Sequence, residues 1–420
     1  MPTLSLAHIE HAQQVLNGRI IRTPLIYSPT FSRMTGAQVF LKLENLQKTG
    51  SFKSRGATYK IISRLPEIGS RGVVAASAGN HAQGVALAAR QASLPATIVM
   101  PEWASITKQE ATRGYGGQVI LRGESINESI GYALELAKEG GTFIHPYDDL
   151  DIITGQGTIG LEILQELPDA DAILVPVGGG GLISGIATAA KAIRPQIKVF
   201  GVQAAACPSA YRAFKLGRTL LVDAAKSIAD GIAVKRIGEL NFPVIQEKVD
   251  GILLVEEDQI AAAMLLLLER KKVLAEGAGV VPLAAMLNDS AALPGNGKIV
   301  LVISGGNVDS PLVGRIIRQG LFRDGRLMRF AVLLDDVPGS LARILTLIAE
   351  QKANVLHIDH TRIGRSMPIN VSRVELEIET RGPGHIRDIS EKLEAAGYRI
   401  FDDAFDLMAS GCNQSIRDND

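Results

Sequence analysis

The chain has 420 residues and a mass of 44.7 kDa, which is long enough for two or three domains with a large buried core. Its 44 basic and 44 acidic residues balance, so no overall positive field favours nucleic acid or an anionic membrane. A hydrophobic content of 46% excludes a disordered chain, and 43 glycines predict many tight turns. The two cysteines, Cys207 and Cys412, are too few for a disulfide framework or a zinc site and favour a reducing compartment.

No segment is expected to enter a membrane. The first ten residues lack a basic stretch followed by an apolar core, so we expect no secretory signal. Residues 172–190 are uncharged over a length that could cross a bilayer, but Pro176 and the four glycines close behind it would break a spanning helix. We therefore predict a buried strand, a loop and a helix start here.

Short apolar runs alternate with amphipathic stretches over roughly the first 320 residues, which is typical of parallel sheets covered by helices on both faces. The clearest amphipathic stretches are 125–139 and 259–271. Eight or more strands over this length favour two sheets, and hence an α/β fold of two lobes with a cleft between them. The predicted strands are 39–43, 72–76, 96–100, 118–121, 142–145, 172–177, 198–202 and 298–303.

The pattern changes at a charged run, 323–328, which we predict to be a linker. The following segment, 329–405, has a βαββαβ order and is predicted to form a separate small domain. Its strands are expected at 330–334, 355–360, 371–379 and 399–401, and its helices after residue 340 and over 385–396. A polar tail at 406–420 is expected to be frayed.

The first segment that indicates chemistry is S-F-K-S-R-G at 51–56, between a strand end and a helix start. A lysine is usually a solvated surface charge, but Lys53 is flanked by Phe52 and small residues. Such a position can be partly dry. Desolvation favours loss of the proton and turns a lysine into a nucleophile.

Three further strand ends carry glycine-rich or polar turns. S-A-G-N-H-A-Q-G at 77–84 enters a helix whose free N–H groups suit a carboxylate, although taken alone an ordinary capped helix start is the simpler interpretation. S-G-G-N at 304–307 is, by itself, an ordinary turn. Four consecutive glycines follow the strand at 172–177 and allow backbone amides to surround an anion.

Nucleotide-binding motifs do not explain these glycines. The four glycines fit no G-x-G-x-x-G register, and the next strand leads to Gln203 where a dinucleotide site needs an acidic residue. The glycines at 155, 157 and 160 have the spacing but lie several polar residues beyond a strand, and no Walker A motif occurs. A lone phosphate is the better ligand.

Taken in order, S-F-K-x-R-G, S-A-G-N-H-x-Q-G, V-G-G-G-G-L and S-G-G-N resemble the motifs of the fold-type II pyridoxal-phosphate enzymes, most closely the threonine and serine dehydratases. The resemblance covers about residues 5–320. It implies a two-lobed catalytic domain over 1–322, with a small lobe at about 54–155 inserted in the large lobe, and pyridoxal 5'-phosphate as the cofactor.

The resemblance also assigns roles to residues. Lys53 is the catalytic residue that bonds to the cofactor, Ser304 bonds the pyridine nitrogen, and Asn80 bonds the phenolic oxygen. The implied cofactor-binding residues are Lys53, Phe52, Asn80, Gly178, Gly179, Gly180, Gly181, Leu182 and Ser304. The residues implied for the substrate carboxylate are Ser77, Gly79, Asn80 and His81.

Residues 328–405 resemble the ACT regulatory module, on a D-x-P-G-x-L match at 336–341 followed by A-N-V at 353–355. This resemblance implies an amino-acid effector at the start of a helix, and we expect a branched-chain amino acid, isoleucine first. A dimerisation domain that binds no ligand is the alternative. The implied effector residues are Asp336, Gly339, Ser340, Leu341 and Asn354.

The neutral Ser304 hydroxyl cannot keep a pyridine nitrogen protonated as a carboxylate would, so loss of a β-hydroxyl is favoured over aminotransfer. We expect deamination of L-threonine to 2-oxobutanoate and ammonia, with L-serine as a secondary substrate, as the first step of isoleucine biosynthesis. The alternatives are a serine or hydroxyaspartate dehydratase, a serine racemase, and a non-catalytic amino-acid sensor. Similar serine racemases carry a second serine where this chain has Ala78, which argues for elimination.

Related enzymes also bind a divalent cation through a glutamate at the position of Gln203, so we expect no metal site. We expect a cytoplasmic homotetramer or homodimer with no nucleic-acid or membrane partner. The preference for threonine over serine, the biosynthetic or catabolic role and the identity of the effector stay open at this point.

Overall fold

A computed structural model describes residues 4–288, 293, 295–362 and 368–401. The chain divides into two compact units, Met1–Val313 and Gly314–Asp420. The division falls inside helix α13 (Ser310–Arg323), and strand β11 begins at Leu327, so the expected linker at 323–328 includes a helix end and a strand start. The predicted tail at 406–420 and the last residues of the predicted small domain, 402–405, lie outside the described residues.

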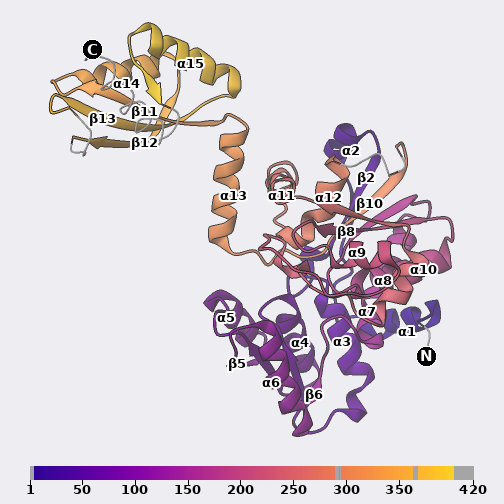
Figure 1. Ribbon diagram of the computed structural model, residues 1–420. Coiled ribbons are helices and arrows are strands. Elements are labelled where there is room, and N and C mark those ends of the chain that lie inside the picture. Colours follow the sequence, from indigo (N-terminus) through magenta and orange to yellow (C-terminus); the bar gives the residue numbers. More distant parts are fainter. Residues whose placement is uncertain (1–3, 289–292, 294, 363–367, 402–420) are drawn as a thin grey trace. The chain divides into compact units, whose positions relative to one another are not determined.

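The larger sheet of the first unit has the strand order β1-β2-β10-β7-β8-β9. Its strands β2, β10 and β8 are labelled in Figure 1. All neighbouring strands in it are parallel except β1 and β2. The apolar runs predicted for β2, β7, β8 and β10 are confirmed, whereas β1 and β9 were not predicted. The strands are β1 (Leu25–Tyr27), β2 (Gln38–Leu43), β7 (Ala172–Pro176), β8 (Lys198–Ala204), β9 (Gly251–Val255) and β10 (Lys298–Ile303).

The smaller sheet has the order β5-β4-β3-β6 and is entirely parallel. Its strands fall between β2 and β7 along the chain, so this sheet is inserted in the sequence of the larger one. All four were predicted, although β6 ends two residues earlier than expected. The strands are β3 (Val73–Ala76), β4 (Ala96–Met100), β5 (Gln118–Leu121) and β6 (Thr142–Phe143).

Helices connect the strands of both sheets, and the strand β7 beneath them is buried along its whole length. The stretch at 172–190 forms a strand, a loop and a helix as predicted, and none of the described helices is long and apolar enough to cross a membrane. The helices are α1 (Leu6–Leu16), α2 (Pro29–Thr35), α3 (Lys53–Ser63), α4 (Asn80–Gln91), α5 (Ile106–Gly114), α6 (Ile126–Lys138), α7 (Leu150–Glu166), α8 (Gly181–Ile193), α9 (Ser209–Leu216), α10 (Asn241–Lys248), α11 (Glu257–Lys271) and α12 (Gly277–Asn288).

Helix α7 packs closely on α3 and α8 because glycines line the contacts. A Cβ on Gly155 would lie 2.7 Å from the Cα of Gly56, and one on Gly185 would lie 2.4 Å from the carbonyl of Ile153. The G-x-G-x-x-G glycines at 155, 157 and 160 therefore lie inside a helix, where they serve helix packing and not a dinucleotide loop.

The second unit has the predicted βαββαβ order, with an antiparallel sheet of order β12-β13-β11-β14. Ile344 and Ile348 are fully buried between helix and sheet, and Leu341 and Leu345 pack against the same core. Its elements are β11 (Leu327–Asp335), α14 (Ser340–Glu350), β12 (Asn354–Thr361), β13 (Val371–Glu379), α15 (Pro383–Ala395) and β14 (Ile400–Phe401).

Candidate active site

Lys53 is the first residue of α3, just beyond the loop that follows β2. Its half-buried side chain donates a hydrogen bond from Nζ to the Pro146 carbonyl at 2.7 Å, and Nζ lies 5.3 Å from the centre of the Phe52 ring. Burial lowers the pKa of Lys53 to about 8, against the Glu276 carboxylate, which raises it. An amine with this pKa is partly uncharged near neutral pH, as nucleophilic attack requires.

The end of β10 lies against the loop that carries Lys53. The Phe52 N–H donates to the Ser304 carbonyl at 3.1 Å, and the Gly306 N–H donates to the Gly50 carbonyl at 2.8 Å. Ser304 is only 3% exposed, and its hydroxyl makes no hydrogen bond to the described residues. The structure thus brings a free, buried hydroxyl to the start of the Lys53 helix.

The asparagine turn at 77–80 links the two sheets of the first unit. Asn80 donates from Nδ2 to Glu276 Oε1 at 2.6 Å, and its Oδ1 accepts from Asn307 Nδ2 at 2.7 Å. Within the turn, the Ser77 hydroxyl accepts from the Gly79 N–H at 3.2 Å. Both polar atoms of the Asn80 side chain are therefore held by residues from the other side of the site.

The side chain of His81 is directed away from the turn. Its Nε2 donates to the Ile144 carbonyl at 2.9 Å, and the residue is 3% exposed. Burial, together with the nearby Lys53 charge, lowers the pKa of His81 to about 3, so the ring is neutral. What His81 can offer a carboxylate is its backbone N–H in the first turn of α4, not a positive charge.

The tetraglycine loop, Gly178–Gly181, runs from β7 into α8. The described residues supply no hydrogen-bond acceptor to its four amide groups. Gly180 has a φ of +100°, and a Cβ on Gly179 would lie 2.3 Å from the Tyr147 ring. The following Leu182 is buried. Free amides in a buried loop that excludes side chains, at the start of a helix, form an anion-binding arrangement.

Glu276, which sequence reasoning did not single out, precedes α12 and is 7% exposed. Burial, and secondarily the Asp230 carboxylate, raises the pKa of Glu276 to about 8, while its hydrogen bond from Asn80 acts in the opposite direction. The sequence signal was a lone acidic residue in A-E-G-A-G before a helix. Asn307 lies in the S-G-G-N motif but was not assigned a role.

Gln203 is fully buried, and both polar atoms of its side chain form hydrogen bonds. Its Oε1 accepts from the Ala210 N–H at 3.0 Å and the Tyr211 N–H at 3.2 Å, and its Nε2 donates to the Val177 carbonyl at 3.3 Å. In the part of the chain that the structure describes, no group of three or more His, Cys, Asp or Glu residues is placed to hold a metal ion.

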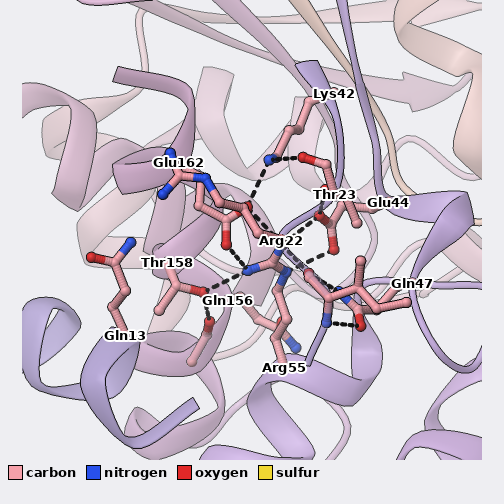
Figure 2. A network of polar contacts seen from close by, with 12 residues as sticks. Gln13, Arg22, Thr23, Lys42, Glu44, Gln47, Arg55, Gln156, Thr158 and Glu162 are labelled. Carbon is pink, nitrogen blue, oxygen red and sulfur yellow. Dashed lines mark hydrogen bonds and ion pairs between the residues drawn. The ribbon is translucent and has the colours of Figure 1, made fainter. Parts of the chain in front are cut away.

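A buried charge network anchors the Lys53 helix two residues further along (Figure 2). The Arg55 guanidinium donates to Glu44 Oε1 and to Glu162 Oε1, both at 2.7 Å. Lys42 Nζ donates to Glu162 Oε2 at 2.6 Å, and Thr23 donates to Glu44 at 2.5 Å. Two positive and two negative side chains from β2, α3, α7 and the turn after β2 thus balance one another in the core.

In the second unit, four of the residues expected to bind an effector, Asp336, Gly339, Ser340 and Leu341, lie around the start of α14. Asn354 does not join them, because it pairs with Glu379 at the end of the sheet where β11 begins, opposite the end that leads to Asp336. Gly339 has a φ of +91° and caps the helix, and the Ser340 hydroxyl accepts from Arg343 at 3.1 Å. The Asp336 carboxylate accepts from Arg362 Nε at 3.0 Å. The amide of Leu341 has no acceptor among the described residues, whereas the exposed Asn354 begins β12.

The chain belongs to the pyridoxal-phosphate dependent enzyme family, whose model matches residues 16–305. It is a pyridoxal-phosphate-dependent lyase, and an ACT domain matches residues 329–397. The chain is 47% identical over 398 residues to the L-threonine ammonia-lyase of Thermotoga maritima, an alignment that covers 94% of this chain and 99% of that protein.

Two solved structures resemble the first unit. Maize serine racemase has a TM-score of 0.71 at 36% identity, covering 76% of this chain and 98% of that chain. The processed form of a threonine deaminase from Solanum lycopersicum has a TM-score of 0.70 at 37% identity, covering 74% of this chain and 86% of that chain. The site fits the family's cofactor, because an amine of lowered pKa suits its aldehyde and free buried amides suit its phosphate.

Proposed function

We propose that this enzyme deaminates L-threonine to 2-oxobutanoate and ammonia, with L-serine as a slower substrate. The observation that carries the proposal is the Lys53 amine, whose lowered pKa leaves it partly neutral. Its Nζ bonds to the Pro146 carbonyl, the neighbouring Tyr147 packs against the tetraglycine loop, and the Phe52 N–H bonds to the Ser304 carbonyl. The similar protein from Thermotoga maritima is named for the same reaction and covers nearly the whole chain.

In this proposal Lys53 bonds to the cofactor aldehyde, with Phe52 beside the ring. The tetraglycine loop and Leu182 hold the phosphate, Ser304 meets the ring nitrogen and Asn80 the phenolic oxygen. The turn at 77–81 binds the substrate carboxylate through the Ser77 hydroxyl and the first amides of α4.

When bound, pyridoxal phosphate supplies the electron sink for the pair released at the substrate Cα. Lys53 would be the base that takes the Cα proton, and it would return that proton to the leaving β-hydroxyl. The Ser304 hydroxyl carries no charge to hold the ring nitrogen protonated, which favours prompt loss of the β-hydroxyl as water. The unsaturated amine that leaves adds water to give the 2-oxo acid and ammonia.

Incubation of the purified full chain with L-threonine or L-serine tests the reaction. We expect equimolar 2-oxo acid and ammonia from both, faster from threonine, because a small apolar contact for its methyl group supplies about 1–3 kcal/mol of preference. The racemase alternative predicts D-serine without ammonia. The sensor alternative predicts binding of the amino acid without turnover.

We further propose that the reaction begins isoleucine biosynthesis and is regulated through the ACT domain. The effector would bind around the start of α14 at Asp336, Gly339, Ser340 and Leu341, where the Leu341 amide has no acceptor among the described residues. Asn354, the fifth expected residue, lies at the other end of the sheet in the same chain. An effector that prefers one of two arrangements of the enzyme by about 1–3 kcal/mol would change the threonine affinity by roughly 5- to 150-fold.

A shortened chain ending at Arg326 tests the regulatory proposal. Threonine titrations with and without isoleucine or valine should show a response in the full chain and none in the shortened one, which keeps its turnover. A full chain that responds to neither amino acid would favour the alternative, a domain that joins subunits and binds no ligand.

We propose a cytoplasmic homotetramer or homodimer, which light scattering of the purified chain would distinguish.

Because both polar atoms of Gln203 already bond within the fold, we expect activity to survive thorough treatment with a chelator. A loss of activity that magnesium restores would contradict this expectation.

A further inference from the structure

Three segments of the first unit meet around Asn241, the first residue of α10. The residue is fully buried. Its Nδ2 donates to the Tyr147 carbonyl at 3.0 Å and to the Gly179 carbonyl at 3.1 Å, and lies 3.3 Å from Asp148 Oδ1. Neither the mechanism nor the sequence motifs gave this asparagine a role.

The orientation of the Asn241 amide is fixed by what surrounds it. All the oxygen atoms close to Nδ2 are acceptors, so a flipped amide would place its own oxygen against them. Its Oδ1 is buried and has no hydrogen-bond partner among the described residues. In this orientation Asn241 Nδ2 donates to the tetraglycine loop, while Oδ1 is left without a hydrogen bond.

The bond to Gly179 determines which way the loop's peptide groups point. The Gly179 carbonyl also accepts from the Gly238 N–H at 3.0 Å, so two donors hold it on the α10 side. In a trans peptide the carbonyl and the next N–H point in opposite directions. The Gly180 N–H is thus turned away from α10, towards the side of the loop where no described residue accepts from it.

The same contact excludes the alternative arrangement of the loop. If the Gly179 carbonyl rotated away from Asn241, its negative end would enter the ring of amides and repel an anion. A Cβ on Gly180, whose φ is +100°, would lie only 2.8 Å from the Cβ of Asn241, so the two residues pack without space between them. Asp148 supports the assembly by accepting from the Leu240 N–H at 2.9 Å.

We infer that Asn241 is a positioning residue for the cofactor phosphate, which acts by holding the Gly179 carbonyl out of the amide ring. The inference rests on the proposed assignment of the tetraglycine loop to that phosphate. It predicts a defect specific to the phosphate group, since Asn241 contacts neither Lys53 nor Ser304 in the described structure.

The test is to titrate the full chain, stripped of cofactor, with pyridoxal 5'-phosphate and with pyridoxal, which lacks the phosphate. Binding is followed by the absorbance of the lysine-bound aldehyde. For Asn241→Ala we expect the Kd of pyridoxal phosphate to rise roughly 10- to 100-fold, by analogy with the loss of metal affinity when a residue that orients a metal ligand is removed. The Kd of pyridoxal should stay nearly unchanged.

Ser184→Ala is the matched control, because the Ser184 hydroxyl contacts the Asn241 carbonyl at 3.4 Å without touching the loop's carbonyls. It should bind both compounds as the wild type does. At saturating pyridoxal phosphate, Asn241→Ala should recover most of its turnover. The inference would be overturned if Asn241→Ala raised the Kd of both compounds equally, or raised neither.

Two further variants keep the outcomes distinct. Gly180→Ala strains the loop itself. If Gly180→Ala selectively weakens the binding of pyridoxal phosphate and Asn241→Ala does not, only the role of Asn241 is wrong. If neither variant discriminates between the two compounds, the assignment of the loop to the phosphate is wrong. If circular dichroism shows that Asn241→Ala is unfolded, Asp148→Asn takes its place. We then expect a smaller loss of affinity that is still specific to pyridoxal phosphate. An equal loss of affinity for pyridoxal and pyridoxal phosphate would contradict the inference.

Discussion

Lys53 and Arg55 stand two residues apart at the start of one helix, and burial opposes the charge of both, yet their pKa values shift in opposite directions. Burial opposes the charge of Arg55, but the Glu44 and Glu162 carboxylates outweigh it and hold its pKa above the usual range. Burial likewise opposes the charge of Glu162, and Arg55 and Lys42 hold the pKa of that carboxyl below its usual range. The charged forms of Arg55 and Glu162 are therefore favoured in spite of their burial.

The Lys53 side of the helix lacks such compensation. Burial lowers the pKa of Lys53 to about 8 and raises that of Glu276 to about 8, because neither group meets a full set of opposite charges. The difference separates two uses of a buried charge. Balanced charges fix the position of α3, and an unbalanced amine at the same helix end is available for chemistry.

The largest expected effect comes from Lys53→Ala, which should abolish both turnover and the absorbance band of the lysine-bound cofactor. The same variant should cost the cofactor-free chain at most about 1 kcal/mol of unfolding free energy, since it removes one hydrogen bond and a poorly compensated charge. Substrate assays, absorbance spectra and urea unfolding check the three parts. A yellow, active Lys53→Ala protein would contradict the proposed role.

The opposite result is expected in the balanced network. Glu162→Gln leaves the Arg55 and Lys42 charges short of a partner, so we expect a loss of about 3–5 kcal/mol of unfolding free energy. Adding Lys42→Met restores the balance between Arg55 and Glu44. The double variant should therefore be less destabilised than the sum of the two single variants by roughly 0.5–3 kcal/mol.

Urea unfolding of the four proteins in this cycle measures the coupling. Glu139→Gln is the surface control, because Glu139 and its partner Arg71 are both 62% exposed and such pairs contribute little. Strictly additive losses would show that the network does not act through charge balance, and the contrast with Lys53 would lose its physical basis.

Much of the fold could be predicted because buried parallel strands appear in the sequence as continuous apolar runs. Strands such as β4 and β10 were predicted to the residue for this reason. β1 has only three residues, which is too short for a distinct run. β9 does form a short apolar run between charged residues, Gly251–Val255, but it was not identified as a strand. The domain boundary inside α13 has no local signal, because a helix continues across it.

The candidate site shows the same limit more sharply. Lys53, Ser304 and the tetraglycine loop are visible in the sequence because each belongs to a short contiguous motif at a strand end. Glu276 reaches Asn80 across 196 residues, and Asn241 reaches Gly179 across 62. Such partners are defined by the packing of distant segments, which no local pattern of residues encodes.

The orientation of a side chain is likewise decided by packing. His81 lies in the motif expected to bind the substrate carboxylate, and its position was predicted correctly as the start of a helix. Only the structure shows that its ring bonds to the Ile144 carbonyl and is neutral. The segment 77–81 therefore combines groups that face the site with one side chain, His81, that is bonded to the small lobe's backbone.

The smallest expected effect concerns Glu276→Gln, which keeps an oxygen for the Asn80 hydrogen bond but removes the charge. A nearby carboxylate favours the protonated lysine, so removing it should lower the pKa of Lys53 further below about 8.

Only the neutral amine attacks an aldehyde. The rate at which the cofactor-free chain takes up pyridoxal phosphate should therefore rise with pH around a midpoint near 8 in the wild type. In Glu276→Gln that midpoint should be lower by roughly half to one pH unit, because Glu276 itself is only partly ionised there. Stopped-flow absorbance across pH 6 to about 10 measures both curves, with Glu139→Gln as the unshifted control. An unchanged or higher midpoint would mean that Glu276 does not act on Lys53 electrostatically, and that the low pKa of the lysine depends on burial alone.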